Sequence, residues 1–410
     1  MKTKRFMLYV LLVVVALALS ATVVSAQDAK VIKIASQSPL SGGQALSGTS
    51  MRNAVELAIE QLSGPLTEMG FTIQYVPFDD QATPDVGVSN AQNIVSDPAI
   101  LALVGHWNSG VAIPSSEVYN ANDLAMISPA NTGPTVTSRG LPVVNRVCGR
   151  DDNQGPTGAR FLSGLGTVNS VYVLHDKTTY GQGVANFFNI EAANLGMTVL
   201  GFEGTEEKSN FDGILQPILA LAPDAIYFGG IYDQTAVFIS QARAAGYTGI
   251  FMGPDGTDAS DFAELAGEAA VGTYYTSAAG PASVYPDAVK FIEDYTAKYG
   301  EGPQPYGPEA YDAAAIALRS IAIAAQLAAI DGVPQVPTRA QVTSVVRATT
   351  DYAGLTGSIT FDAYGDRASA NYYVLQVKSA DPTMWSTNEL LETVSVPSPF
   401  TALMESMMGQ

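Results

Sequence analysis

Short apolar segments alternate along most of the chain with segments whose apolar residues recur at helical spacing. Residues 101–105 form a continuous apolar run typical of a buried strand, whereas residues 54, 55, 58, 59 and 62 share one face of a helix. Repetition of such pairs predicts β-α-β units, in which parallel sheets are covered by helices on both faces. The predicted strands are 31–35, 71–78, 101–105, 125–127, 171–174, 198–201 and 225–229, and the predicted helices are 51–61, 86–95, 111–121, 183–194, 235–245 and 309–327.

Two parts of the chain repeat the same order of elements, which indicates two lobes of similar construction. Residues 34–48 read as a strand, a polar loop and a glycine before a helix, and residues 171–183 repeat that order. In open α/β sheets, ligands bind beyond the carboxyl ends of the strands. The loops after these strands are therefore candidate binding loops, and the alternative that they are only solvated turns stays open here.

The first 26 residues have the three-part pattern of a secretory signal peptide. A basic start, Lys2–Arg5, precedes an apolar run over residues 6–19, and Val24–Ala26 provide a cleavage pattern before Gln27. The run is short for a membrane span, although an uncleaved anchor is the alternative. No cysteine stands near this point, which argues against a lipoprotein, and no later segment is expected to cross a bilayer. The mature chain of about 384 residues should form two domains outside the cytoplasm.

Composition narrows the classes of function. Three of the 20 Lys and Arg residues lie in the signal peptide, which leaves 17 against 39 acidic residues, a net charge of −22. Such a surface repels nucleic acid, so no nucleic-acid partner is expected. The single cysteine, Cys148, cannot form an internal disulfide and reads as a small buried apolar group. The chain has two histidines, and no nucleophile–base or phosphate-loop motif is recognisable. We therefore expect no metal site, no cofactor and no enzymatic activity.

Two loops carry the strongest local signals for ligand binding. Gly105–Gly110 follows a buried strand and opens a helix, whose free N–H groups suit a carboxylate, and Ser109 adds a hydroxyl. Ser128–Thr132 follows the next strand, where Thr132 adds another hydroxyl and the carbonyl of Ala130 can accept from an ammonium group. Plain helix capping remains the alternative for both hydroxyls. His106 reads as a hydrogen-bonded structural residue rather than a base. The acidic pairs Asp79-Asp80 and Asp151-Asp152 do not suggest acid/base chemistry, because adjacent side chains point apart.

Nine segments, taken in order, resemble the leucine/isoleucine/valine-binding proteins of bacterial ABC transporters, which are type I periplasmic binding proteins. The resemblance extends over nearly the whole mature chain. The segments are Pro39–Gly42, Asp79-Asp80, Val104–His106, Ile127–Ala130, Asp152–Pro156, His175–Gly181, Ala242–Gly246, Phe251–Gly256, and Thr360–Asp362 with Gly365-Asp366.

The resemblance implies two doubly wound α/β lobes, joined by three crossing segments, that close around one amino acid. The crossings are expected near Val147–Gly149, Thr276–Ala278 and Leu355–Gly357. The resulting boundaries are a signal peptide at 1–26, lobe 1 at 27–147 plus 277–355, lobe 2 at 148–276 plus 356–392, and a mobile tail at 393–410.

Carried over by position, the family's binding residues fall on seven residues of this chain. Ser109 and Thr132 are implied as carboxylate donors, and the carbonyl of Ala130 as an ammonium acceptor. Asp255 stands where the family has the glutamate that binds the ammonium group, so its reach is one methylene shorter, and either the ligand sits deeper or a water bridges the gap. The remaining residues are implied as walls of the cleft: Tyr180 from the second lobe, and Trp107 and Tyr306 around the ligand side chain.

Three departures from the family bear on specificity. The first-loop tyrosine of the family is replaced by Ser47, and the tyrosine after the Gly-Gly pair falls at Ile231, with Tyr232 next to it. Trp107 and Asn108 stand where the family has a leucine and a disulfide cysteine. That disulfide is therefore absent, and Trp107 should shrink or flatten the side-chain pocket.

These observations favour an extracytoplasmic solute-binding protein of an ABC importer that binds a free amino acid, branched-chain or otherwise neutral and aliphatic. Its expected partners are a membrane permease and its ATPase subunits, and the protein itself is expected to be a monomer. The alternatives are a ligand sensor of the same fold, a binding protein for a small amide or urea-type solute, and an extracellular hydrolase. The missing nucleophile–base set counts against the hydrolase.

Overall fold

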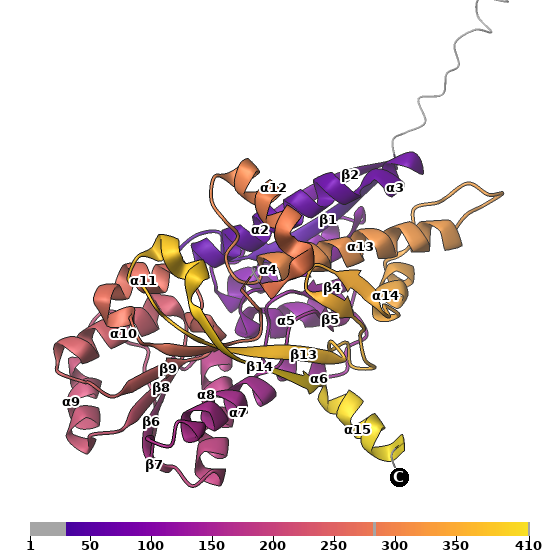
Figure 1. Ribbon diagram of the computed structural model, residues 1–410. Coiled ribbons are helices and arrows are strands. Elements are labelled where there is room, and N and C mark those ends of the chain that lie inside the picture. Colours follow the sequence, from indigo (N-terminus) through magenta and orange to yellow (C-terminus); the bar gives the residue numbers. More distant parts are fainter. Residues whose placement is uncertain (1–29, 282–283, 409–410) are drawn as a thin grey trace, which may run out of the picture.

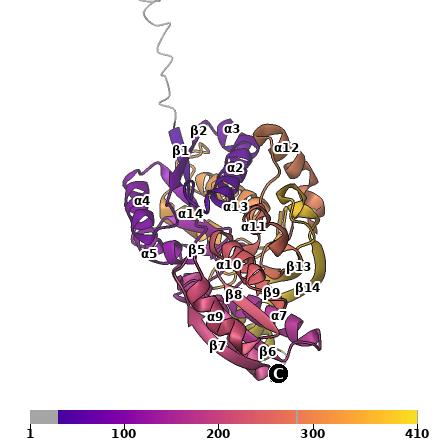
Figure 2. The same cartoon turned by 90° about the vertical axis from the view of Figure 1, so that its left-hand side faces the viewer.

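Residues 30–281 and 284–408, which the computed structural model describes, form two α/β lobes, as predicted (Figure 1). The signal peptide predicted at residues 1–26 lies outside the described residues. The second view shows one lobe above the other, with the central helices α10 and α11 near their junction (Figure 2).

The first lobe is built on a five-stranded parallel sheet with the strand order β2-β1-β3-β4-β5. Helices α2 and α13 bury one face of this sheet, and α4 and α5 bury the other. The strands are β1 (Lys30–Ser38), β2 (Phe71–Asp79), β3 (Ile100–Gly105), β4 (Ala125–Ser128) and β5 (Val144–Arg146). The helices are α2 (Ala45–Leu62), α3 (Gly64–Glu68), α4 (Pro84–Ser96), α5 (Ser109–Asn120), α6 (Thr135–Ser138), η4 (Pro286–Ala288), α12 (Val289–Tyr299), α13 (Gly307–Leu327) and α14 (Arg339–Arg347).

The second lobe has a seven-stranded sheet with the order β14-β13-β10-β9-β8-β6-β7. Helices α7 and α8 pack on one face and α9, α10 and α11 on the other. The strands are β6 (Ser170–His175), β7 (Thr198–Gly204), β8 (Ala225–Gly229), β9 (Ile250–Gly253), β10 (Tyr274–Ser277), β13 (Ser369–Gln376) and β14 (Glu389–Pro397). The helices are α7 (Asp151–Gly164), α8 (Thr179–Asn194), α9 (Asp212–Leu221), α10 (Tyr232–Ala244), η1 (Asp255–Thr257), α11 (Ser260–Ala266), η2 (Gly267–Ala270) and η5 (Pro382–Thr387).

The apolar pattern explains why this lobe is doubly wound. Strand β8 is buried along its whole length, as expected of a parallel strand with helices on both faces. Strands β13 and β14 depart from the predicted parallel arrangement, because they form an antiparallel hairpin at the edge of the sheet. Every residue of β14 is at least partly accessible, so its sequence lacks the apolar run that marks the central strands.

Three segments cross between the lobes. The first, residues 147–150, joins β5 to α7, and the second leaves β10 at residue 278. The third runs over residues 360–368, later than the predicted Leu355–Gly357. The reason is a short hairpin, β11 (Tyr352–Gly354) with β12 (Gly357–Ile359), whose Ile359 belongs to the core of the first lobe.

The tail predicted at residues 393–410 begins later in the structure. Residues 393–397 pair with β13 as the end of β14, and helix α15 (Pro399–Met408) follows. This helix buries none of its residues and projects from the body of the protein (Figure 1).

Helix α13 corrects the expectation that no later segment could cross a bilayer. Among the described residues it is the one helix long and apolar enough by length and composition. However, 67% of its most apolar stretch is buried, and it packs on the sheet of the first lobe as a core helix.

Candidate functional site

Five of the seven predicted binding residues, all except Ser109 and Tyr306, line a small cavity between the two lobes. Loops after β3 and β4 bring residues from lobe 1, and the starts of α8, α10 and η1 bring residues from lobe 2. The cavity has a volume of about 20 Å³, roughly the room of one water molecule. Its lining residues are Trp107, Asn108, Ala130, Thr132, Tyr180, Ile231, Asp255 and Gly256. A molecule as large as an amino acid can therefore enter only if the lobes move apart.

The Asp255 carboxyl group is the most heavily bonded group at this cavity. Its Oδ1 accepts from the hydroxyl of Tyr180 at 2.6 Å and from Nε2 of Gln154 at 2.9 Å, and its Oδ2 accepts from the hydroxyl of Tyr306 at 2.6 Å. Burial raises the pKa of Asp255, while these three hydrogen bonds oppose the rise. Since Tyr306 belongs to lobe 1 and Asp255 to lobe 2, the contact also joins the lobes.

Backbone features position the hydroxyl groups of Tyr306 and Tyr180 at Asp255. Tyr306 has φ 69°, a left-handed conformation that is uncommon for a bulky residue and here directs its hydroxyl to Asp255. The Tyr180 hydroxyl also accepts from the backbone N–H of Gly256 at 2.8 Å. A Cβ atom at Gly256 would overlap the backbone carbonyl oxygen of Gly230 and crowd this hydroxyl, so the position requires glycine.

On the lobe 1 side, two buried hydroxyl groups lie at or next to the loop that follows β4. Ser109, the first residue of α5, accepts from the backbone N–H of Gly133 at 3.1 Å, which leaves its own proton available to a ligand. Thr132 lines the cavity, and its buried hydroxyl makes no hydrogen bond of good geometry within residues 30–281 and 284–408, although it lies close enough to Asp151 to oppose the rise in the pKa of that carboxyl. Such a donor is costly to bury unless a ligand satisfies it.

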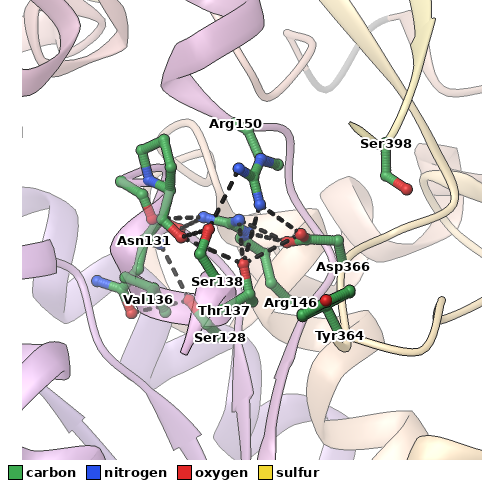
Figure 3. A network of polar contacts seen from close by, with 12 residues as sticks. Ser128, Asn131, Val136, Thr137, Ser138, Arg146, Arg150, Tyr364, Asp366 and Ser398 are labelled. Carbon is green, nitrogen blue, oxygen red and sulfur yellow. Dashed lines mark hydrogen bonds and ion pairs between the residues drawn. The ribbon is translucent and has the colours of Figure 1, made fainter. Parts of the chain in front are cut away.

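A buried ion-pair network fixes this loop to the crossing segments (Figure 3). Arg146, which is fully buried, donates from Nη1 to the carbonyls of Asn131 at 2.7 Å and Gly133 at 3.0 Å. Its Nε donates to Asp366, on the third crossing, at 2.9 Å, and Arg150, on the first crossing, reaches the same carboxylate at 2.6 Å. Burial alone would raise the pKa of Asp366, but the two arginines hold it below its ordinary value. Thr132 therefore lies on a loop whose neighbouring carbonyls are fixed by the network.

Sequence reasoning missed Asp151 and Gln154 as members of the site. Asp151 begins α7, is fully buried, and has no hydrogen-bond partner for either carboxyl oxygen among the described residues. Burial raises its pKa well above the ordinary value, and the charge of Asp255 adds to the effect. The sequence shows Asp151 only as one of two adjacent acids, whereas the fold brings it near enough to Asp255 for the two charges to interact. Local sequence carries no signal of this proximity. Gln154 could have been suspected from the Asp152–Pro156 segment that carries the family resemblance.

The structure shows where the residues that depart from the family lie relative to the cavity. Trp107 and Tyr306 pack edge to face, with ring centroids 5.3 Å apart. Ile231 faces the cavity, whereas Tyr232 is buried in the core of lobe 2. Asn108 stands where the family has a disulfide cysteine, and its side-chain amide donates to the side-chain oxygen of Gln44 at 2.8 Å. Ser47 is buried on α2 and is not part of the cavity lining.

The two chemically conspicuous residues His106 and Cys148 lie outside the cavity lining. The ring of His106 is fully buried among Gln37, Tyr119 and Asp80, at 3.2–3.4 Å from their polar atoms. Cys148 is a buried free thiol on the first crossing, and burial raises its pKa.

Comparison with known proteins gives consistent matches. Residues 31–382 match the family described as periplasmic binding protein. A Leu/Ile/Val-binding protein homolog of Brucella abortus is 30% identical over 84% of this chain and 89% of its own length. A leucine-, isoleucine-, valine-, threonine- and alanine-binding protein of Pseudomonas aeruginosa is 32% identical over 60% of this chain and 66% of its own. The crystal structure of the leucine-binding protein LivK of Thermotoga maritima superimposes with a TM-score of 0.78 at 28% identity, covering 88% of this chain and 98% of that one.

Proposed function

Because the chain belongs to the periplasmic binding protein family, we propose that it binds a free neutral amino acid between its lobes and delivers it to an ABC importer. The type I fold and the resemblance to Leu/Ile/Val-binding proteins are confirmed by the family match and by the relatives. The observation that carries the proposal is the buried Asp255 carboxyl, fixed by three donors at a cavity that also exposes the unpartnered hydroxyl of Thr132. One end of the cavity suits an ammonium group and the other a carboxylate.

The ligand's two charged groups would bind to separate sets of residues in the cleft. Its ammonium group would meet Asp255 and the Ala130 carbonyl, with Asp151 as a second nearby carboxyl. Its carboxylate would accept from Ser109 and Thr132, at the N-terminus of α5, where free N–H groups and the helix dipole favour an anion. Closure excludes water, which strengthens each of these contacts. An amide or urea-type ligand is less suited, because it would leave two buried carboxyls without a positive charge.

The side chain of the ligand would lie against Trp107, Tyr306 and Ile231. These walls are apolar and aromatic, and within residues 30–281 and 284–408 no group of three His, Cys, Asp or Glu residues could hold a metal ion. The geometry therefore supports recognition of an aliphatic or otherwise neutral side chain, and it supports binding rather than catalysis.

The same proposal covers location and partners. A family of periplasmic binding proteins implies a place outside the cytoplasm, reached through the predicted signal peptide. The partners are a membrane permease and its ATPase subunits, and the protein acts as a monomer. A sensor of the same fold would use the same cleft but report to a receptor instead.

Replacement of Asp255 by Asn tests the binding mode. Leucine and 4-methylpentanoate, which is leucine without its ammonium group, are compared by isothermal titration calorimetry. Loss of the charge should cost leucine about 2–5 kcal/mol, because the ligand's ammonium group is then buried without a counter-charge. The deaminated analogue should lose little.

The matched variant is Ser109→Ala, which should weaken both ligands alike by about 0.5–3 kcal/mol, because both carry the carboxylate. A folding defect would weaken both ligands in both variants. Equal losses for the two ligands in Asp255→Asn would show that another group binds the ammonium.

A further inference from the structure

A second and much larger cavity lies between the lobes, beside the amino-acid cleft. It has a volume of about 620 Å³, within the range of small-molecule binding sites. Lobe 2 contributes Asp258, Tyr275 and Trp385, and lobe 1 contributes Ile292 and Gln304. We call this space the Trp385 cavity.

The Trp385 cavity is lined mainly by apolar surface, and its charged lining residues are all acidic. Trp385 and Tyr275 stack with ring centroids 5.6 Å apart, and prolines from both lobes add apolar surface. Among the described lining residues, the charged groups are Asp258 and Glu301, both acidic. Aromatic faces and carboxylates both attract organic cations, so charge and surface select the same class of ligand.

Asp258 is the polar anchor of the cavity. Its side chain is 4% exposed, and Oδ1 accepts from the indole N–H of Trp385 at 2.9 Å. Burial raises the pKa of Asp258 to about 7, against the lowering effect of this hydrogen bond. A buried carboxyl of this kind is stabilised in its charged form by a cation placed next to it.

Two segments connect the Trp385 cavity to the amino-acid cleft. Gln304 in lobe 1 accepts from the backbone N–H of Ser260 in lobe 2 at 3.2 Å, and two residues later Tyr306 reaches Asp255. Asp258 follows Asp255 directly across the short helix η1. A ligand that touches both walls of the cavity therefore favours the same closed arrangement that the cleft requires.

We propose that the Trp385 cavity is a second ligand site, which binds a small organic ammonium compound with an apolar or aromatic body and promotes closure of the lobes. The site goes beyond amino-acid binding and is expected whether or not the cleft binds leucine. Only its effect on the cleft rests on the proposed function. By linkage, each ligand then raises the affinity of the other.

The test uses 2-phenylethylamine as the probe and 2-phenylethanol as its neutral counterpart of similar shape. Calorimetry on the mature full-length chain should show one site for the amine and at least tenfold weaker binding of the alcohol. Asp258→Asn should weaken the amine at least tenfold. In the presence of the amine, the Kd for leucine should fall several-fold.

A second variant keeps the test decisive if Asp258→Asn does not fold. Ser386 is exposed on the rim of the cavity, so Ser386→Trp should block it, abolish amine binding and leave leucine binding intact. Unchanged amine binding in Ser386→Trp, equal affinities for amine and alcohol, or competition between amine and leucine would each overturn the proposal. Failure of leucine to bind, with amine binding intact, would instead overturn the proposed function alone.

Discussion

Replacement of Asp366 by Asn should destabilise the protein more than any exposed acid-to-amide change, because it removes the anion of a buried network. The Asp366 carboxylate lies between Arg146 and Arg150 and also accepts from Thr137 at 3.0 Å (Figure 3). Arg146 has no exposure to solvent, so its charge would stay buried without a counter-ion. Breaking such a pair typically costs about 3–5 kcal/mol. Because Asn keeps one acceptor oxygen, we expect the lower end of that range, about 3 kcal/mol at neutral pH.

The stability difference between wild type and Asp366→Asn should also depend on pH. The pKa of Asp366 is lowered in the folded protein, so its contribution to stability is present above its unfolded pKa and is lost as the pH falls through the folded value. The difference between wild type and Asp366→Asn should therefore be largest at neutral pH and shrink in acid, below the ordinary aspartate pKa. Urea unfolding at neutral pH and in acid measures both values.

Asp381→Asn is the matched control, since Asp381 is also an aspartate whose pKa is lowered by hydrogen bonds, but it is fully exposed. Its free energy of unfolding should hardly change. The network should also affect ligand binding, because Arg146 fixes the carbonyls on either side of Thr132. A variant Asp366→Asn with wild-type stability at neutral pH, or with a deficit that persists unchanged in acid, would refute this account.

Two further predictions concern the side-chain pocket and a buried acid of lobe 1. Trp107→Leu should widen the pocket. Calorimetry should then show that the binding free energy of leucine improves relative to that of alanine by about 1–3 kcal/mol. An unchanged ratio of the two Kd values would show that Trp107 does not set ligand size. Burial raises the pKa of Glu309 to about 8, so its contribution to stability is complete below its unfolded pKa and is lost as the pH rises through the folded value. Relative to Glu309→Gln, wild type should lose roughly 1.4 kcal/mol of unfolding free energy per pH unit between about pH 5 and pH 8. Urea unfolding at several pH values measures this, and the same pH dependence in both proteins would contradict it.

Much of the fold could be predicted from local patterns. The alternation of short apolar runs with helical spacing identified β3, β6 and β8, because those strands are buried on both faces. It missed β9 and β10, which are also central but have only four residues each. The edge hairpin β13–β14 and helix α15 were not predicted as regular elements. Strand β14 is accessible along its length, so neither a continuous run nor a clean alternation marks it. The third crossing was misplaced for a related reason, since the packing of β11 and β12 on lobe 1 leaves no signal in sequence spacing.

The sequence by itself determined the class of fold and identified most of the groups on which the proposed ligand chemistry depends. Each depends on residues close together in the chain: the β-α-β alternation, the hydroxyls Ser109 and Thr132 at loop–helix junctions, and the motif that ends in Asp255. Only the tertiary structure decided which groups share a space. It brought Asp151 within electrostatic reach of Asp255, joined Arg146 to Asp366 across 220 residues, and formed the Trp385 cavity from two lobes. Local sequence carries propensity and periodicity, whereas burial, and with it the pKa of each carboxyl, depends on every element that packs around the group.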